Sequence, residues 1–262
     1  MLSNSAPHDA AGQGSHVVQL HDANVHALTS NVASFLVEGL KAGGGAVLIA
    51  TPLHAASFVR EIARSGIDTD RLMRDGRLMQ FDAEQTLSRI MVGGHPDADR
   101  FDQVVGSAIR NLKHATGTSG LRAYGEMVGL LWKAKQFPAA IRLEQLWNRL
   151  RTTIAFDLFC AYPIDVFDKD FDVGVMDALL CAHTHLLPSG ANAVLQDALD
   201  RAIGEMHDVR AADQDRKIPR GVTREWATLP EPEATILWLR AKHPEKADAI
   251  LDRARAYYQA SA

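Results

Sequence analysis

The chain has 262 residues, enough for one large domain or for one domain with a smaller appendage. Its formal net charge of −4 and the lack of a long basic run argue against a nucleic-acid partner. Two cysteines do not indicate an oxidising compartment, and no apolar stretch reaches the roughly 20 residues of a membrane helix. We therefore expect a cytoplasmic protein without a membrane partner.

Strands and helices are predicted to alternate between residues 15 and 187, because short apolar runs alternate with segments of helical 3–4 spacing. The predicted strands are residues 16–20, 46–50, 78–81, 121–128 and 153–162. The predicted helices are residues 25–40, 52–65, 83–91, 101–112, 138–150 and 173–183. The triple glycine 43–45 is expected to end the first helix, and Thr51-Pro52 to begin the second.

The last 70 or so residues have a different pattern. A helix is predicted over residues 192–210, a polar linker over 211–224, and two short helices over 233–242 and 244–258. The expected organisation is a disordered N-terminus at 1–14, an α/β domain at 15–190 and a helical extension at 191–262.

Regular alternation predicts βαβ units, and hence a doubly wound, mainly parallel sheet with helices on both faces. The loop that holds phosphates in related folds has the pattern G-x-x-x-x-G-K-[ST]. The residues between the first predicted strand and helix are His21-Asp22-Ala23-Asn24, without glycine or lysine. ATP binding by the usual route is therefore not expected.

Glu126 follows the fourth predicted strand, at the carboxyl edge where doubly wound sheets place their sites. The structural alternative, a carboxylate paired with an arginine or a backbone amide, is favoured over catalysis. Trp132 and Trp147 either wall an apolar pocket or belong to the core. Leu143 and Trp147 share a helical face, from which Arg142 and Glu144 are expected to point away.

The histidines do not predict a metal site. His183 and His185 are expected on a helix, where residues two apart do not face each other. His16 and His21 are five residues apart across a strand end, and no Cys-x-x-Cys or His-x-x-x-His pattern accompanies them. No cofactor and no catalytic residue is predicted. The candidate ligand-binding residues, all expected near strand ends, are His16, His21, Asp82, Glu126, Trp132, Arg142 and Tyr162.

Several separate stretches carry a family resemblance. They are His16–Leu20, Phe35–Gly43, Phe81–Leu87, Gly94–Asp97 with Arg100-Phe101, Gly125–Val128 with Leu131-Trp132, Ala140–Asn148, Phe159–Pro163, Cys181 and His183–His185. In this order they resemble the MEDS family, a sensory domain named for methanogens, methylotrophs and the dichloromethane-responsive repressor. The resemblance implies a RecA-like or KaiC-like core without its phosphate loop, and the sensing of small molecules such as hydrocarbon derivatives.

Members of that family commonly join this domain to a histidine kinase or a DNA-binding domain. The present sequence shows neither, so we expect a stand-alone bacterial regulator that binds a small molecule or a signalling protein. The C-terminal helices would pass the signal through a homo-oligomer or a partner. Their apolar residues with amphipathic spacing are Ile236, Leu237, Leu239, Ile250, Leu251 and Tyr257.

Two alternatives remain open at this stage. The first is a degenerate RecA-like or KaiC-like regulator that still binds a nucleotide, with Glu126 and Asp82 as its polar groups. The second is an enzyme for a small organic substrate, which requires Glu126, His16, His21 and Arg142 to converge at one cleft.

Overall fold

The computed structural model describes residues 14–22, 25–117, 120–169, 171–188, 192–205 and 229–261. The chain forms two compact units. The first contains residues up to 17 and 28–162, and the second contains 18–27 and 163–262. The predicted linker 211–224 and the predicted disordered residues 1–13 lie outside the described residues, and the predicted boundary at residue 190 stays a prediction.

The first unit is an α/β layer structure. Its strands are β1 (His16–Leu20, which continues into the second unit), β2 (Ala46–Ala50), β3 (Leu78–Asp82), β4 (Met91–Val92), β5 (His95–Pro96), β6 (Arg122–Gly125) and β7 (Asp157–Tyr162). Its helices are α1 (His26–Lys41, whose first two residues belong to the second unit), α2 (Pro52–Arg64), α3 (Thr69–Arg74), α4 (Ala83–Ile90), α5 (Ala98–Phe101), the π-helical turn η1 (Asp102–Gly106), α6 (Ser107–Thr116), α7 (Met127–Lys133) and α8 (Phe137–Thr153).

The sheet of the first unit has the strand order β3-β2-β6-β7-β1. The pairs β2–β3, β2–β6 and β6–β7 are parallel, with Ile49 opposite both Phe81 and Gly125. Every residue of β2 is buried, as expected for a central strand covered on both faces. The predicted doubly wound, mainly parallel α/β fold is confirmed.

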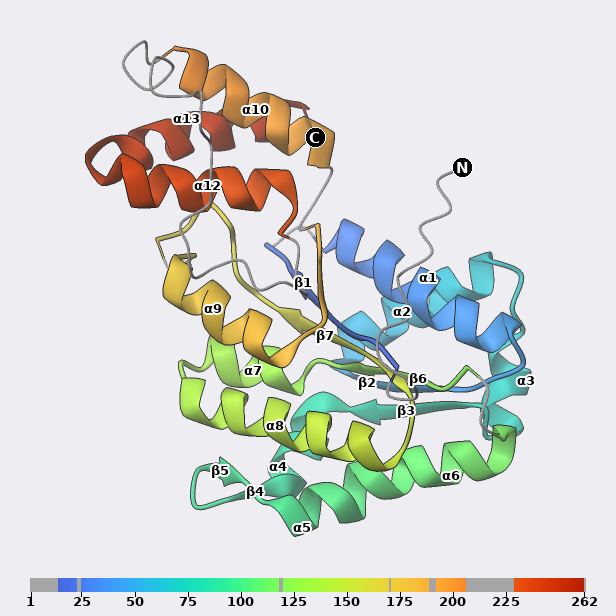
Figure 1. Ribbon diagram of the computed structural model, residues 1–262. Helices are drawn as coiled ribbons and strands as arrows, with labels where there is room; N and C mark the ends of the chain where they lie inside the picture. The colour runs from blue at the N-terminus through green and yellow to red at the C-terminus, as the bar shows by residue number, and fades with distance from the viewer. Residues whose placement is uncertain are drawn as a thin grey trace. The chain divides into compact units, whose positions relative to one another are not determined.

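Helices cover both faces of this sheet (Figure 1). On one face, Phe35 of α1 packs against Phe159 of β7, and Phe58 of α2 packs against Tyr124 of β6. On the other face, Trp147 of α8 lies over Gly125 of β6. Adjacent strand residues point to opposite faces, so one short strand supplies contacts to helices in both layers.

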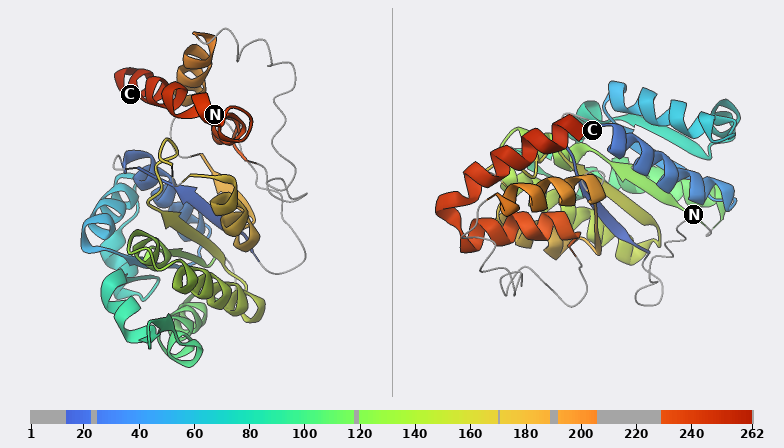
Figure 2. Two further views of the ribbon diagram at one scale, coloured as in Figure 1. Left: turned by 90° about the vertical axis from the view of Figure 1, so that its left-hand side faces the viewer. Right: turned by 90° about the horizontal axis from the view of Figure 1, so that it is seen from above.

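The second unit contains β8 and four described helices. They are α9 (Val173–Ala182), β8 (His185–Leu187), α10 (Asn192–Gly204), α12 (Glu231–Lys242) and α13 (Pro244–Ser261). Strand β8 is the neighbour of β1, and Nε2 of Gln19 donates to the carbonyl oxygen of Pro188 at 3.2 Å. Helices α10, α12 and α13 pack together (Figure 2). Within this bundle Ile236, Leu237, Leu239, Ile250 and Leu251 are buried.

Some predicted boundaries were wrong. The fourth strand ends at Gly125 rather than at 128, because Glu126 has helical backbone angles (φ −92°, ψ −12°) and the next apolar residues form α7. Helix α8 extends to Thr153, so β7 begins only at Asp157. The segment after α4 forms the β4–β5 hairpin, and its turn residues Gly93 and Gly94 both have positive φ.

The close approach of α1 to Gly120, just before β6, and to Arg122 at its start yields a test of the fold. A Cβ atom on Gly39 would lie 2.7 Å from the carbonyl oxygen of Gly120 and 2.9 Å from Cγ of Arg122. We expect Gly39→Ala to lower the free energy of unfolding by about 1–3 kcal/mol, because backbone must move to admit the methyl group. Urea denaturation measures the change.

The matched control is Gly204→Ala in α10, where a Cβ would meet nothing within 4 Å. Alanine has a higher helix propensity than glycine, so this variant is expected to be as stable as the parent or more stable by up to about 1 kcal/mol. Equal losses in the two variants would contradict the close packing at Gly39.

Candidate functional site

A polar cluster lies at the carboxyl ends of β2 and β6. Thr51 directly follows β2 and stands at the N-cap of α2, whereas Glu126 directly follows β6. The Glu126 carboxylate accepts hydrogen bonds from the Thr51 backbone N–H at 2.8 Å and from the Thr51 hydroxyl at 3.2 Å. Nδ1 of His54 lies 2.7 Å from the Glu126 Oε1 atom and donates to it, since a carboxylate only accepts.

Thr51 was predicted to stand at the start of this helix, and it occupies the N-cap of α2. Its hydroxyl does not cap the helix, however, but donates to Glu126. The carboxylate takes over the capping role from outside the helix, because it accepts the Thr51 N–H at the positive end of α2. Glu126 is only 7% exposed and is held by these donors.

A second polar cluster lies between α8 and the sheet. It joins His16 of β1, Glu144 and Asn148 of α8, and Cys160 and Tyr162 of β7. The Tyr162 hydroxyl donates to Oε1 of Glu144 at 2.6 Å, and the Cys160 thiol faces Oε2 of Glu144 at 3.7 Å. Glu144 was expected to point away from the Trp147 face of its helix, but it is buried. The two partners on β7 and His16 on β1 provide the polar surroundings that make this burial possible.

Burial and the Glu144 charge change the acidity of the cluster. Burial, followed by the repulsion of the Glu144 carboxylate, raises the pKa of the Cys160 thiol well above its ordinary value. The same two causes raise the pKa of the Tyr162 hydroxyl. Burial lowers the pKa of the nearby Arg151 guanidinium, an effect that Asp157 opposes. Both Cys160 and Tyr162 therefore keep their protons at neutral pH and donate hydrogen bonds.

The acidity of Cys160 leads to a prediction about its reactivity. In a Cys181→Ser variant Cys160 is the only thiol. We expect it to react with a disulfide reagent at pH 7 at least about 100-fold more slowly than in denaturant, because reaction requires local opening and a thiolate. The pKa of the Cys160 thiol is higher in the folded than in the unfolded state. The folded state therefore loses stability as the pH rises above the ordinary thiol pKa. Fast labelling of the native protein at pH 7 would contradict this.

The remaining candidate residues each have a hydrogen-bond partner of their own. Asp82 is the N-cap of α4 and accepts from the Gln85 N–H at 2.8 Å. Arg142 is exposed on α8, and its guanidinium is 3.4 Å from the Gln145 side-chain oxygen. In the second unit, Nδ1 of His21 lies 3.0 Å from the carbonyl oxygen of Asp22.

The two tryptophans have different environments. Trp132 packs edge-on against Tyr162 at 5.3 Å between ring centroids, next to the second cluster. Trp147 is fully buried and belongs to the core. Of the predicted site residues, the structure therefore places His16 and Tyr162 in one cluster, with Trp132 beside it, and Glu126 in another. His16, Glu126 and Arg142 have different partners, so these three do not form the single group that the enzyme hypothesis requires.

Sequence spacing did not reveal the partners of these residues. Thr51 and His54 are 75 and 72 positions from Glu126, and Cys160 is 144 positions from His16. His183 was expected on a helix, but it is the C-cap of α9, and its Nδ1 lies 2.7 Å from the Leu179 carbonyl oxygen. His185 belongs to β8, so the helical argument against the two histidines does not apply.

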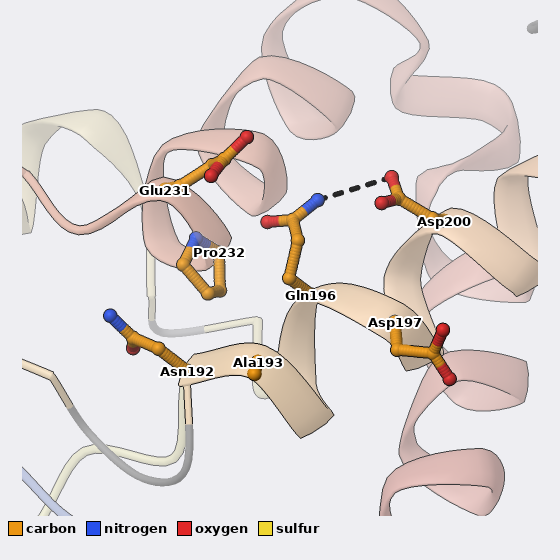
Figure 3. A pocket seen from close by; sticks show the side chains of 7 residues that line it. All are labelled: Asn192, Ala193, Gln196, Asp197, Asp200, Glu231 and Pro232. Carbon is orange, nitrogen blue, oxygen red and sulfur yellow. Dashed lines mark hydrogen bonds between the residues drawn. The ribbon is translucent and has the colours of Figure 1, made fainter.

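The second unit contains an acidic cavity of about 340 Å³ between α10 and the start of α12 (Figure 3). Its lining residues are Asn192, Ala193, Gln196, Asp197, Asp200, Glu231 and Pro232. Nε2 of Gln196 donates to Oδ1 of Asp200 at 3.1 Å, as the dashed line in Figure 3 shows. Three carboxylates make this cavity unsuitable for an anionic ligand.

The mainly parallel sheet with helices on both faces and a polar cluster at its carboxyl edge defines an α/β domain of the doubly wound class. The sequence profile of the MEDS family, described as the MEthanogen/methylotroph, DcmR Sensory domain, matches residues 15–184. The chain belongs to this family, as its sequence resemblance indicated, and this supports a sensing or regulatory role. A search of curated proteins finds no match to the chain. Among the described residues, no helix has both the length and the hydropathy that a membrane crossing demands.

Proposed function

We propose that the chain is a cytoplasmic sensor that binds a neutral small organic molecule at the carboxyl ends of β2 and β6. The observation that carries the proposal is the buried Glu126 carboxylate, which links the start of α2 to the end of β6. Doubly wound sheets bind their ligands at this edge. Membership of a sensory-domain family supports the same role.

The charge at this edge favours a neutral ligand over a phosphate. A helix N-terminus attracts anions through its free N–H groups and its dipole. At α2 the Thr51 N–H and hydroxyl and the His54 ring already bind Glu126. An incoming phosphate would compete with this carboxylate for the same donors and would be repelled by it. The nucleotide-binding alternative is accordingly the weaker one.

An apolar side chain lies beside the polar cluster. Leu53 is 76% exposed and stands between Thr51 and His54 in the first turn of α2. An apolar group next to a few fixed polar groups is the usual composition of a small-molecule site. Hydrocarbon derivatives with one hydroxyl, carbonyl or halogen fit this composition.

The test is a thermal-shift screen of the full chain against neutral halogenated and oxygenated hydrocarbons, small carboxylates, and ATP, ADP and GTP with Mg²⁺. A ligand at 100 times its Kd stabilises the folded state by about 2.7 kcal/mol. We expect a neutral organic molecule to raise the Tm, and Leu53→Ala and His54→Ala to reduce that rise. Asp97→Asn, which alters the half-buried N-cap of α5, is the control that should retain the full rise in Tm. A shift with nucleotides alone would contradict the proposal.

The output is proposed to pass from the second unit to a signalling partner or a second copy. The apolar residues predicted for this role are buried in the bundle of α10, α12 and α13, apart from the half-buried Tyr257. An oligomer would therefore have to use other side chains of these helices. Sedimentation of the full chain with and without the organic ligand measures whether its oligomeric state changes.

A further inference from the structure

Three side chains with metal-binding atoms meet between α8 and the sheet. Nε2 of His16 lies 3.4 Å from Sγ of Cys160 and 3.4 Å from Oε2 of Glu144. Sγ of Cys160 lies 3.7 Å from the same Glu144 oxygen. His16 and Cys160 have no exposed surface and Glu144 is 2% exposed, so water does not solvate the group. These three residues are called the His-Glu-Cys cluster below.

The hydrogen bonds around His16 decide which ring nitrogen has the lone pair. Nδ1 of His16 lies 2.9 Å from Oδ1 of Asn148. The same Asn148 oxygen accepts from the Arg151 guanidinium at 3.1 Å, which identifies that atom as the oxygen because arginine only donates. Nδ1 of His16 must therefore donate its proton to Asn148. In the neutral ring, Nε2 then directs its lone pair at Cys160 and Glu144.

The Glu144 carboxylate is oriented in a similar way. Its Oε1 atom accepts the hydrogen bond of the buried Tyr162 hydroxyl at 2.6 Å. Its Oε2 atom faces His16 and Cys160. Metal-binding histidines almost always donate their other N–H, and metal-binding carboxylates are themselves hydrogen-bonded. Asn148 and Tyr162 supply these two supporting contacts.

The spacing of the three atoms matches one coordination geometry. Zinc binds histidine nitrogen at about 2.0–2.1 Å, carboxylate oxygen at about 2.0–2.2 Å and thiolate sulfur at about 2.3 Å, in a tetrahedral arrangement. These lengths place ligand atoms about 3.6 Å apart for N and S, about 3.4 Å for N and O, and about 3.6 Å for S and O. The observed separations are 3.4, 3.4 and 3.7 Å.

We propose that the His-Glu-Cys cluster binds a divalent metal ion of the zinc type, through Nε2 of His16, Oε2 of Glu144 and Sγ of Cys160. The mixture of imidazole, carboxylate and thiolate favours zinc over magnesium or calcium, which prefer oxygen ligands alone. On binding, the Cys160 S–H bond breaks, its proton goes to solvent, and a sulfur–metal bond forms. The two negative ligands balance the charge of the ion.

Without a metal, the same atoms form a buried hydrogen-bond network, in which the thiol proton lies between acceptors. A nitrogen lone pair and a carboxylate oxygen 3.4 Å apart repel each other unless a proton or a cation lies between them. The metal site is independent of the ligand proposed at Glu126, because the two clusters use different residues. The metal test below uses metal ions alone, so either proposal can fail without the other.

The experiment uses the full chain without an affinity tag, stripped of metal and then titrated with Zn²⁺ and with Co²⁺. We expect one ion per chain by elemental analysis. Cobalt is expected to give tetrahedral visible bands and a near-ultraviolet charge-transfer band from the thiolate. Cys160→Ser should abolish the charge-transfer band, whereas Cys181→Ser, which alters the other cysteine, should retain it. His95→Ala, at an exposed histidine, is the control for His16→Ala.

Two positioning variants keep the test decisive if the ligand variants fail to fold. Asn148→Ala and Tyr162→Phe leave all three ligands in place and should weaken Zn²⁺ binding by about 10- to 100-fold. Proton release on loading is read from the buffer dependence of the binding enthalpy. Less than one ion per chain at saturation, or a cobalt spectrum without the thiolate band in the native protein, would overturn the proposal and leave a hydrogen-bond network.

Discussion

Replacement of Trp147 by alanine is expected to lower the free energy of unfolding by about 3–5 kcal/mol. The indole has no exposed surface and lies where α8 packs on β6. Its Cζ2 atom is 3.2 Å from the position of a Cβ on Gly125, so the ring fills the space that this glycine leaves. Phe101 contacts it edge-on, with ring centroids 5.2 Å apart. Alanine would leave a cavity that these fixed elements are unable to close.

A comparison with Trp147→Phe distinguishes the effect of the cavity on stability from the effect of removing the indole N–H. Within the described residues, Nε1 of Trp147 is buried without a hydrogen-bond partner. Phenylalanine keeps a ring in the site and removes this unsatisfied donor, so its loss is expected to be less than half of the alanine loss. Urea denaturation of both variants measures the two values. A larger loss of unfolding free energy in Trp147→Phe than in Trp147→Ala would contradict this prediction. It would show that the surrounding residues close the cavity when the ring is removed.

The alternation of strands and helices was predictable because it depends on local patterns. The continuous apolar run 46–50 and Thr51-Pro52 indicate a buried strand followed by a helix, and β2 and α2 confirm them. The end of β6 was not predictable in the same way. Apolar residues lie on both sides of Glu126, so the local pattern does not mark the end of the strand. The tertiary hydrogen bonds of Glu126 explain why the chain turns into α7 there.

The candidate sites were predictable only in part. Glu126 was identified by its position directly after a strand, because doubly wound sheets place their sites at the carboxyl ends of their strands. Glu144 was missed because helical spacing shows which residues share a face, but not that a buried face contains polar partners. Those partners, Cys160 and Tyr162, are 16 and 18 positions further along the chain, on β7. A polar residue within an otherwise apolar strand, such as His16 or Gln19, was the one available signal.

Replacement of Tyr162 by phenylalanine is expected to lower the free energy of unfolding by about 2–3 kcal/mol. The hydroxyl donates to Oε1 of Glu144 at 2.6 Å in a fully buried position. Its removal leaves a buried carboxylate oxygen without this donor, and a charged group that loses its partner away from water costs more than a neutral one. The loss should shrink in a Glu144→Gln background, because an uncharged amide needs the donor less.

Tyr257→Phe is the matched control for this prediction, because it makes the same change at a hydroxyl–carboxylate contact. The Tyr257 hydroxyl donates to Glu205 at an exposed position of the second unit. Water replaces the lost bond there, so the expected loss is below about 1 kcal/mol. A double-mutant cycle of Tyr162→Phe with Glu144→Gln measures the coupling of the buried pair directly. Coupling no larger than the loss at Tyr257 would mean that the Glu144 carboxylate is stabilised chiefly by its other neighbours, His16 and Cys160.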